Sequence, residues 1–329
     1  MSNLTKNQKN FVFITGGLGF IGTNLSVYLA KNYPKSIITL FDDFSMKVKL
    51  KKRLEYVSNF KNIRVIKGKI ENDKKLNDSI KNHNIVFHLA SNADISAAAK
   101  KPDLDFYQGV YLTKNVLEVS RLNKIKEFYF TSGSGVYGED HNKIFNESSS
   151  LYHPVSPYGA NKLSSESLIS AYAHMFNIKA ISFRLANVVG KFQTHGVIYD
   201  FLNKLKNNHK ILKVLGNGNQ LKSYIYVDDV IAGIVFGAKH SKKLYDTFNI
   251  ANNDSVTVKF IAKECIKSFA NKFNFDLANP IYQKQLKGWN GDVPIIKMST
   301  KKINSLGWRH QKTSVAAVKE TVNQLLQVL

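Results

Sequence analysis

Short apolar runs alternate with longer amphipathic segments through the first half of the chain. Six runs are rich in β-branched and aromatic residues and predict strands at 11–15, 36–41, 63–68, 85–90, 127–132 and 179–184. The segments between them, about 10 to 20 residues long, have the length and spacing of helices. Nearly continuous apolar strands that alternate with helices are typical of a parallel sheet covered on both faces. We therefore predict an α/β fold built on a doubly wound parallel sheet.

The pattern loosens after Arg184, where Gly- and Asn-rich turns such as 215–220 become frequent. A last helix is expected to begin at Ser314, with Ser314 as its cap. One face of that helix is apolar and consists of Val315, Val318, Val322, Leu325, Leu326 and Leu329.

At 329 residues the chain can bury a large core, and we expect two interleaved domains. The first comprises residues 1–186 together with a returning segment at about 223–250. The second is a smaller mixed α/β domain made of 187–222 and 251–329, which we expect to bind the substrate.

The formal net charge of +23 raises the question of nucleic-acid binding, because basic surfaces attract phosphates. Only five of the 47 basic residues are Arg, however, and the Lys residues are spread along the chain together with abundant Asn. Base recognition favours Arg, and recognition surfaces concentrate their charge. A genome biased toward Lys and Asn codons explains the composition better, so no specific nucleic-acid partner is expected. The positive field would still attract an anionic substrate.

Hydrophobic residues make up 43% of the chain, which is typical of a soluble globular protein. No apolar run approaches the roughly 18 residues of a membrane span, and the first ten residues are too polar for a secretory signal. Cys265 is the only cysteine, so neither an intrachain disulfide nor a cysteine-based zinc site can form, and the histidines show no metal spacing. We expect a cytoplasmic protein with no membrane contact and no metal.

The first predicted strand leads into TGGLGFIG (15–22), in which Gly16, Gly19 and Gly22 precede a helix. Glycines at this spacing permit a tight turn and close backbone approach to a pyrophosphate, which the helix N-terminus then attracts. Asp42 follows 20 residues after Gly22, at the end of the second strand, where its carboxylate can bind both ribose hydroxyls of an adenosine. This arrangement predicts a Rossmann-type domain that binds NAD, because the carboxylate would repel the 2′-phosphate of NADP.

A second motif, SPYGANKLSSE (156–166), has the features of a helix start with Pro157 in its first turn. Tyr158 and Lys162 are four residues apart and share one face of that helix. A nearby ammonium stabilises a phenolate, and we expect it to lower the pKa of Tyr158 by roughly 3 units from its usual value of about 10. Tyr158 would then serve as a general base for a hydroxyl proton and return it as an acid. Lys162 would also hold the nicotinamide ribose.

The loop FTSGSGVYG (130–138) lies one strand-to-helix unit upstream and offers hydroxyls among glycines. Ligands of such sheets bind at the carboxyl ends of the strands, where this loop begins. It either forms a plain Gly/Ser turn or brings one hydroxyl to the reacting atoms, and we favour the second interpretation.

Taken together, these motifs resemble the extended short-chain dehydrogenase/reductases, in the nucleotide-sugar epimerase/dehydratase group typified by UDP-glucose 4-epimerase. The resemblance covers almost the whole chain. Its blocks occur in order as TGGLGFIG (15–22), FDDFS (41–45), FHLAS (87–91), TSGSGVYG (131–138), SPYGANK (156–162), RLANVVG (184–190), HGVIYDF (195–201), SYIYVDD (223–229) and WNGDVP (289–294).

The resemblance implies roles for individual residues. Tyr158 corresponds to the family's acid–base residue, with Lys162 and a loop serine as its catalytic partners. The residues implied in NAD binding are Gly16, Gly19, Phe20, Ile21, Gly22, Asp42, Asp43, Ile70, Leu89, Ala90, Ser91, Tyr158 and Lys162. Those implied in binding a nucleotide-diphospho-sugar, expected to be a UDP-sugar, are Ser134, Asn187, Val197, Lys222 and Asp292. The family also implies a homodimer packed through two helices, here about 103–121 and 158–176.

This chain departs from the family pattern at several positions. Many members carry the catalytic Ser or Thr at the position of Gly133, which Ser132 and Ser134 flank here. Glycine-rich relatives favour Ser132, and Ser134 remains the alternative; we expect one of them to donate a hydrogen bond to the sugar 4-oxygen. Other departures near the ligands are Lys69, Gly109, Lys222 and Trp289.

The family resemblance implies oxidation of the sugar at C4, rotation of the 4-keto sugar and return of the hydride to the opposite face. Dehydratases of the group usually carry an Asp-Glu pair where Ser134 and Gly135 stand, and elimination needs those proton carriers. We therefore predict C4 epimerisation. The alternatives are a 4,6-dehydratase, decarboxylase or 4-keto reductase and, more remotely, a non-catalytic RNA-binding protein with this fold.

Overall fold

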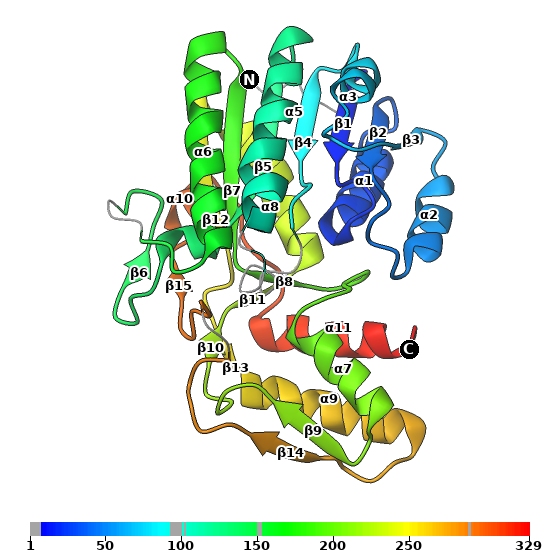
Figure 1. The fold of residues 1–329 in the computed structure, drawn as a ribbon, viewed down its shortest axis with the longest axis vertical. Coiled ribbons are helices and arrows are strands. Elements are labelled where there is room, and N and C mark those ends of the chain that lie inside the picture. The colour runs from blue at the N-terminus through cyan, green and yellow to red at the C-terminus, as the bar shows by residue number, and fades with distance from the viewer. Residues whose placement is uncertain (1–7, 93–100, 102, 150–152, 289–290) are drawn as a thin grey trace.

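The computed structural model describes residues 8–92, 101, 103–149, 153–288 and 291–329 (Figure 1). Its main sheet has seven parallel strands in the order β12-β7-β5-β4-β1-β2-β3. The strands are β1 (Phe11–Thr15), β2 (Ile37–Asp42), β3 (Ile63–Lys67), β4 (Ile85–His88), β5 (Glu127–Gly133), β7 (Lys179–Leu185) and β12 (Tyr245–Ile250). The predicted doubly wound α/β sheet and its six strands are confirmed, with ends that shift by at most two residues. The strand order reverses between β1 and β4, which opens a crevice at their carboxyl ends.

Helices cover both faces of the sheet. The core on one face includes side chains of α1 (Phe20–Asn32) and α8 (Val227–His240). The core on the other face includes side chains of α3 (Asp73–Ile80), α5 (Leu112–Leu122) and α6 (Pro157–Phe176). Further helices near the sheet are α2 (Leu50–Ser58), the short α4 (Asp103–Asp105), the π-helix η2 (Phe106–Tyr111) and α10 (Lys301–Ser305).

A smaller layer lies beyond the carboxyl ends of the strands (Figure 1). Its helices α7 (Val197–Asn207), α9 (Val258–Phe273) and α11 (Ser314–Leu326) contact one another. Four two-stranded pairs accompany them: β6 (Ile144–Phe145) with β15 (Lys297–Met298), β8 (Asn187–Val189) with β11 (Tyr224–Tyr226), β9 (Ile211–Val214) with β14 (Asn279–Tyr282), and β10 (Leu221–Lys222) with β13 (Val256–Thr257).

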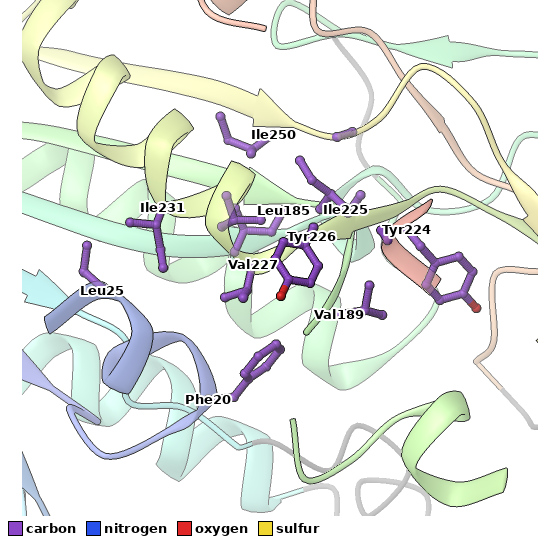
Figure 2. Packing of buried hydrophobic residues seen from close by; sticks show 14 of the residues in the cluster. Phe20, Leu25, Leu185, Val189, Tyr224, Ile225, Tyr226, Val227, Ile231 and Ile250 are labelled. Carbon is purple, nitrogen blue, oxygen red and sulfur yellow. The ribbon is translucent and has the colours of Figure 1, made fainter. Parts of the chain in front are cut away.

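The two layers share one hydrophobic core, because a single cluster of buried residues runs from the sheet into α7, α9 and α11. Figure 2 shows part of it, where Val227 of α8 and Tyr226 of β11 lie between Phe20 of α1 and Leu185 of β7. Among the residues described, no helix combines the length and the apolar character that crossing a membrane requires.

The last helix begins at Ser314 as predicted, but its cap was assigned to the wrong residue. The Thr313 hydroxyl accepts from the Ala316 N–H (3.2 Å), whereas the Ser314 hydroxyl donates to the Asp254 carbonyl (3.1 Å). Val315 is 37% exposed and lies off the buried face, which consists of Val318, Val322, Leu325 and Leu326 together with the smaller Ala317 and Thr321. Ser314 is fully buried against β11, where its hydroxyl also accepts from the Tyr224 N–H (3.1 Å).

Candidate active site

A cavity of about 820 Å³ lies between the carboxyl ends of the strands and the smaller layer. It is lined by every site residue that the sequence suggested: Gly16, Gly19, Phe20, Ile21, Gly22, Asp42, Asp43, Ile70, Leu89, Ala90, Ser91, Ser132, Ser134, Tyr158, Lys162, Asn187, Val197, Lys222 and Asp292. Segments that are far apart in the sequence therefore meet at one site. No group of His, Cys, Asp or Glu side chains in the described part of the chain is arranged to hold a metal ion.

The glycine turn brings backbone close to backbone at one end of the cavity. Gly16 has φ +65°, and a Cβ there would lie 2.8 Å from the Ala90 nitrogen. A Cβ on Gly22 would lie 2.3 Å from the Gly16 oxygen, so neither position tolerates a side chain. Gly19 precedes α1 without any side-chain cap, which leaves the first N–H groups of the helix available to an anion. The turn therefore fits the pyrophosphate of a dinucleotide.

Asp42 ends β2 beside this turn, and the fold fixes its carboxylate. Its Oδ2 accepts from the Leu18 N–H (2.9 Å), and its Oδ1 accepts from the Phe44 N–H (2.9 Å). Burial raises the pKa of Asp42, while these two N–H groups and the nearby Arg53 lower it. The held carboxylate is suited to the ribose hydroxyls of NAD, whereas Asp43 is exposed and accepts from the Ser45 N–H (2.8 Å).

Tyr158 and Lys162 share the first turns of α6, which starts at Pro157. The Ser156 hydroxyl accepts from the Gly159 N–H (3.2 Å) and caps the helix. The Lys162 Nζ donates to the Thr131 carbonyl (2.8 Å) and lies 5.6 Å from the centre of the Tyr158 ring. Burial lowers the pKa of Lys162 to about 8, so this side chain is mostly an ammonium at neutral pH.

The expected fall in the pKa of Tyr158 was wrong for the protein without ligands. Burial, followed by the negative charge of Asp105, raises the pKa of Tyr158 to about 12. Removing a phenolate from water is costly, and a nearby carboxylate disfavours it further, so both causes act in the same direction.

Other polar side chains at the site had no signal in the sequence. Asp105 is 2% exposed, and its Oδ1 accepts from the Asn92 amide (2.8 Å), while its Oδ2 has no partner among the described residues. Gln193 and Gln220 line the cavity with buried amide oxygens that also lack a partner. His88 is fully buried between the hydroxyls of Thr15 (2.7 Å) and Thr113 (3.0 Å).

On the substrate side, Lys222 and Asp292 form an ion pair (2.5 Å), so an incoming phosphate must compete with this carboxylate for the ammonium. The Asn187 amide donates to the Ser223 carbonyl (3.1 Å), and Val197 begins α7 after Gly196, which offers no side-chain cap. Trp289, one of the departures from the family pattern, lies outside the described residues.

Two glycines, at the end of β5 and in the turn that follows it, lie against the Tyr158 ring. A Cβ on Gly133 would lie 3.8 Å from the Tyr158 Oη, and a Cβ on Gly135 would lie 3.8 Å from Cδ1 of the same ring. The Ser132 hydroxyl is buried without a partner, whereas Ser134 is half-buried and begins a short 3₁₀ turn, η3 (Ser134–Tyr137).

Comparison with known proteins agrees with this geometry. The chain is 27% identical to human dTDP-D-glucose 4,6-dehydratase over 321 residues, covering 94% of this chain and 88% of the human protein. It is 28% identical over 319 residues to a putative UDP-glucose 4-epimerase of Methanocaldococcus jannaschii, covering 95% and 97% of the two chains. A crystal structure of UDP-galactose 4-epimerase matches with a TM-score of 0.83 and 30% identity, covering 97% of this chain and 99% of that one.

A family model matches residues 12–251, from the first strand of the sheet to the residue after its last. The match confirms the resemblance predicted from the motifs and the cofactor predicted from the glycine turn and Asp42. The chain thus belongs to the NAD dependent epimerase/dehydratase family, with NAD as its cofactor.

Proposed function

We propose that the protein epimerises a nucleotide-diphospho-sugar at C4 through a transient 4-keto intermediate, with a UDP-sugar as substrate. The observation that supports this most directly is the placement of Tyr158 and Lys162 in the cavity that also contains the dinucleotide turn and Asn187. An acid–base group, a hydride acceptor and a sugar nucleotide can therefore meet at one point.

In the proposed mechanism the Tyr158 oxygen takes the proton of the sugar 4-hydroxyl and later returns it. Bound NAD supplies the acceptor and later the donor of the C4 hydride. The Lys162 ammonium favours the phenolate, and its bond to the Thr131 carbonyl holds it at the end of β5. A serine of the loop 132–134 donates a hydrogen bond to the 4-oxygen, and rotation of the 4-keto sugar exposes its other face.

A 4,6-dehydratase is the second candidate, because the identities of 27% to the human dehydratase and 28% to the archaeal putative epimerase are nearly equal. The residues that follow β5 distinguish the two reactions better than these identities do. Elimination of water across C5 and C6 requires a further acid and base, and the positions from which dehydratases usually supply them are Ser134 and Gly135. Neither can carry a proton as a carboxylate does, which favours epimerisation.

We further propose a homodimer and a division into two domains. The pair formed by η2–α5 and α6 supports the dimer, because it exposes Phe106, Tyr107 and Met175, which are 52%, 59% and 76% exposed. The division follows residues 1–186 with a returning segment at about 223–250, and is supported by the pairing of β12 with β7 in the main sheet.

The decisive experiment is product analysis after incubation of the NAD-loaded protein with UDP-glucose and with UDP-N-acetylglucosamine. We expect the C4 epimer of at least one sugar, and Tyr158→Phe should lower the rate by about 10²- to 10⁴-fold. A stable 4-keto-6-deoxy product would instead establish the dehydratase. Salt-sensitive RNA binding that survives Tyr158→Phe, with no sugar product, would support the non-catalytic alternative.

A further inference from the structure

The position that faces the Tyr158 hydroxyl carries no side chain in this protein. A Cβ built on Gly133 would lie 3.8 Å from the Tyr158 Oη and 3.9 Å from the Leu185 carbonyl oxygen, which is ordinary contact distance. A serine at 133 would therefore fit and would present its hydroxyl to the tyrosine. Because Gly133 stands there instead, the hydroxyl that accompanies Tyr158 has to come from a neighbouring residue.

Ser132 is poorly placed for this role. Gly133 and Ser132 are consecutive residues of β5, and successive Cβ atoms of a strand point to opposite faces. Since the Cβ direction of Gly133 leads toward the Tyr158 hydroxyl, that of Ser132 leads away from it. The Ser132 side chain is only 4% exposed, and its hydroxyl is buried without a hydrogen-bond partner. Ser132 lines the cavity, but its hydroxyl is enclosed and its Cβ direction leads away from the Tyr158 hydroxyl.

Ser134 is more exposed than Ser132. It is the first residue after β5, where the 3₁₀ turn η3 breaks the strand alternation, and it lines the cavity half-buried. The residues on either side, Gly133 and Gly135, both approach the Tyr158 ring, with Cβ positions 3.8 Å from its Oη and its Cδ1. Ser134 therefore carries the one side chain of the segment 133–135, between two glycines that lie against the ring.

We propose that Ser134, and not Ser132, is the catalytic hydroxyl of this site, displaced by one residue from the position that Gly133 occupies. It donates to the sugar 4-oxygen as that oxygen transfers its proton to Tyr158. The proposal rests on the proposed 4-keto chemistry, and it chooses the alternative to Ser132, the residue that glycine-rich relatives favour.

The test compares Ser134→Ala, Ser132→Ala and the double variant Gly133→Ser/Ser134→Ala in NAD-loaded protein. Loss of one preorganised donor costs about 10²- to 10³-fold in kcat, and we expect that loss for Ser134→Ala with little change in KM. Ser132→Ala should lose clearly less activity than Ser134→Ala. The double variant should regain at least about tenfold over Ser134→Ala, because a serine at 133 faces the tyrosine hydroxyl.

A structural role of Ser134 would lower the melting temperature and NAD content of Ser134→Ala and would not be rescued by Gly133→Ser. That result, or a larger loss in Ser132→Ala than in Ser134→Ala, would overturn the proposal. Reduction of bound NAD on mixing with the sugar nucleotide is measured in parallel with epimer formation. If the wild type reduces NAD without forming an epimer, the epimerase proposal fails while Ser134 is still tested by the reduction rate; if it does neither, both proposals fail.

Discussion

Two clusters of buried charge lie one helical turn apart on α6, and their hydrogen bonding differs. Around Glu166 and Arg184, both 4% exposed at the side chain, the polar groups are matched in pairs. Arg184 donates through Nε to Glu166 Oε1 (3.0 Å) and through Nη2 to Oε2 (2.6 Å), while its Nη1 donates to the Tyr137 hydroxyl (3.0 Å). That hydroxyl in turn donates to the Asn249 side-chain oxygen (2.6 Å).

Around Tyr158 and Lys162, by contrast, some buried polar atoms have no hydrogen-bond partner among the described residues. The Asp105 Oδ2 and the Ser132 hydroxyl are buried without partners, and burial shifts the pKa of both Tyr158 and Lys162 toward their neutral forms. Buried polar groups are normally satisfied, so a cluster that leaves some unsatisfied and shifts its pKa values has a function other than stability. The Arg184 cluster joins β7 to α6 through satisfied hydrogen bonds, and we propose that the Lys162 cluster binds ligands.

The largest effect is expected from removing one partner of the matched pair. Glu166→Ala leaves the Arg184 guanidinium buried without its carboxylate, and we expect a loss of about 3–5 kcal/mol in the free energy of unfolding. Denaturant titration measures it. The double variant Glu166→Leu/Arg184→Met should lose much less, because no lone charge remains. Equal losses in the two variants would show that the ion pair itself, rather than the avoidance of a lone charge, provides the stability.

The second prediction concerns Lys162, whose substitution should stabilise the fold while abolishing activity. The pKa of Lys162 is about 8 in the folded protein and 10.5 when unperturbed. At pH 7 the buried ammonium therefore destabilises the folded state. Lys162→Met should therefore raise the free energy of unfolding at pH 7 by about 1–3 kcal/mol.

The sign of the pH dependence provides the control for Lys162→Met. Between about pH 8 and 10.5 the unfolded lysine binds more protons than the folded one, so wild-type stability gains from Lys162 as the pH rises through this range. The advantage of Lys162→Met should shrink over the same range, and an advantage independent of pH would refute the explanation.

The smallest effect is expected at Asp105. Burial and then the charge of Asp105 raise the pKa of Tyr158, so Asp105→Asn should lower that pKa and shift the rise of activity with pH toward lower pH. At a fixed neutral pH the gain should be at most about tenfold. The matched control is Asp103→Asn, which removes an exposed carboxylate from the same short helix and should leave the pH profile unchanged. A shift toward higher pH in Asp105→Asn would contradict the assignment.

Much of the fold and of the candidate site could be predicted from local sequence. The glycine turn, Asp42 and the Tyr158–Lys162 spacing each depend on a few consecutive residues, and the structure brings them to one cavity. The strand β12 was not among the predicted strands, because Asp246 and Asn249 interrupt its apolar pattern. Lys302, a partner of Asp246, and Tyr137, a partner of Asn249, become adjacent to them only in the folded chain.

The same limit explains why the pKa of Tyr158 was wrong and why Asp105 was missed. The spacing of Tyr158 and Lys162 gives their proximity, but not the burial that dominates both pKa values. Asp105 is far from Tyr158 in sequence, and its interaction with that residue depends on how α4 packs against α6.

The position of β12 at the edge of the main sheet has a consequence for synthesis of the protein on the ribosome. Strand β7 is complete at Leu185, but its neighbour β12 ends at Ile250, after the chain has passed through α7 and returned. Until that point has emerged, the nascent chain carries β7 with one edge unpaired, and such edges template aggregation. Synonymous codons that slow translation between these two strands should therefore increase the dependence of this protein on chaperones.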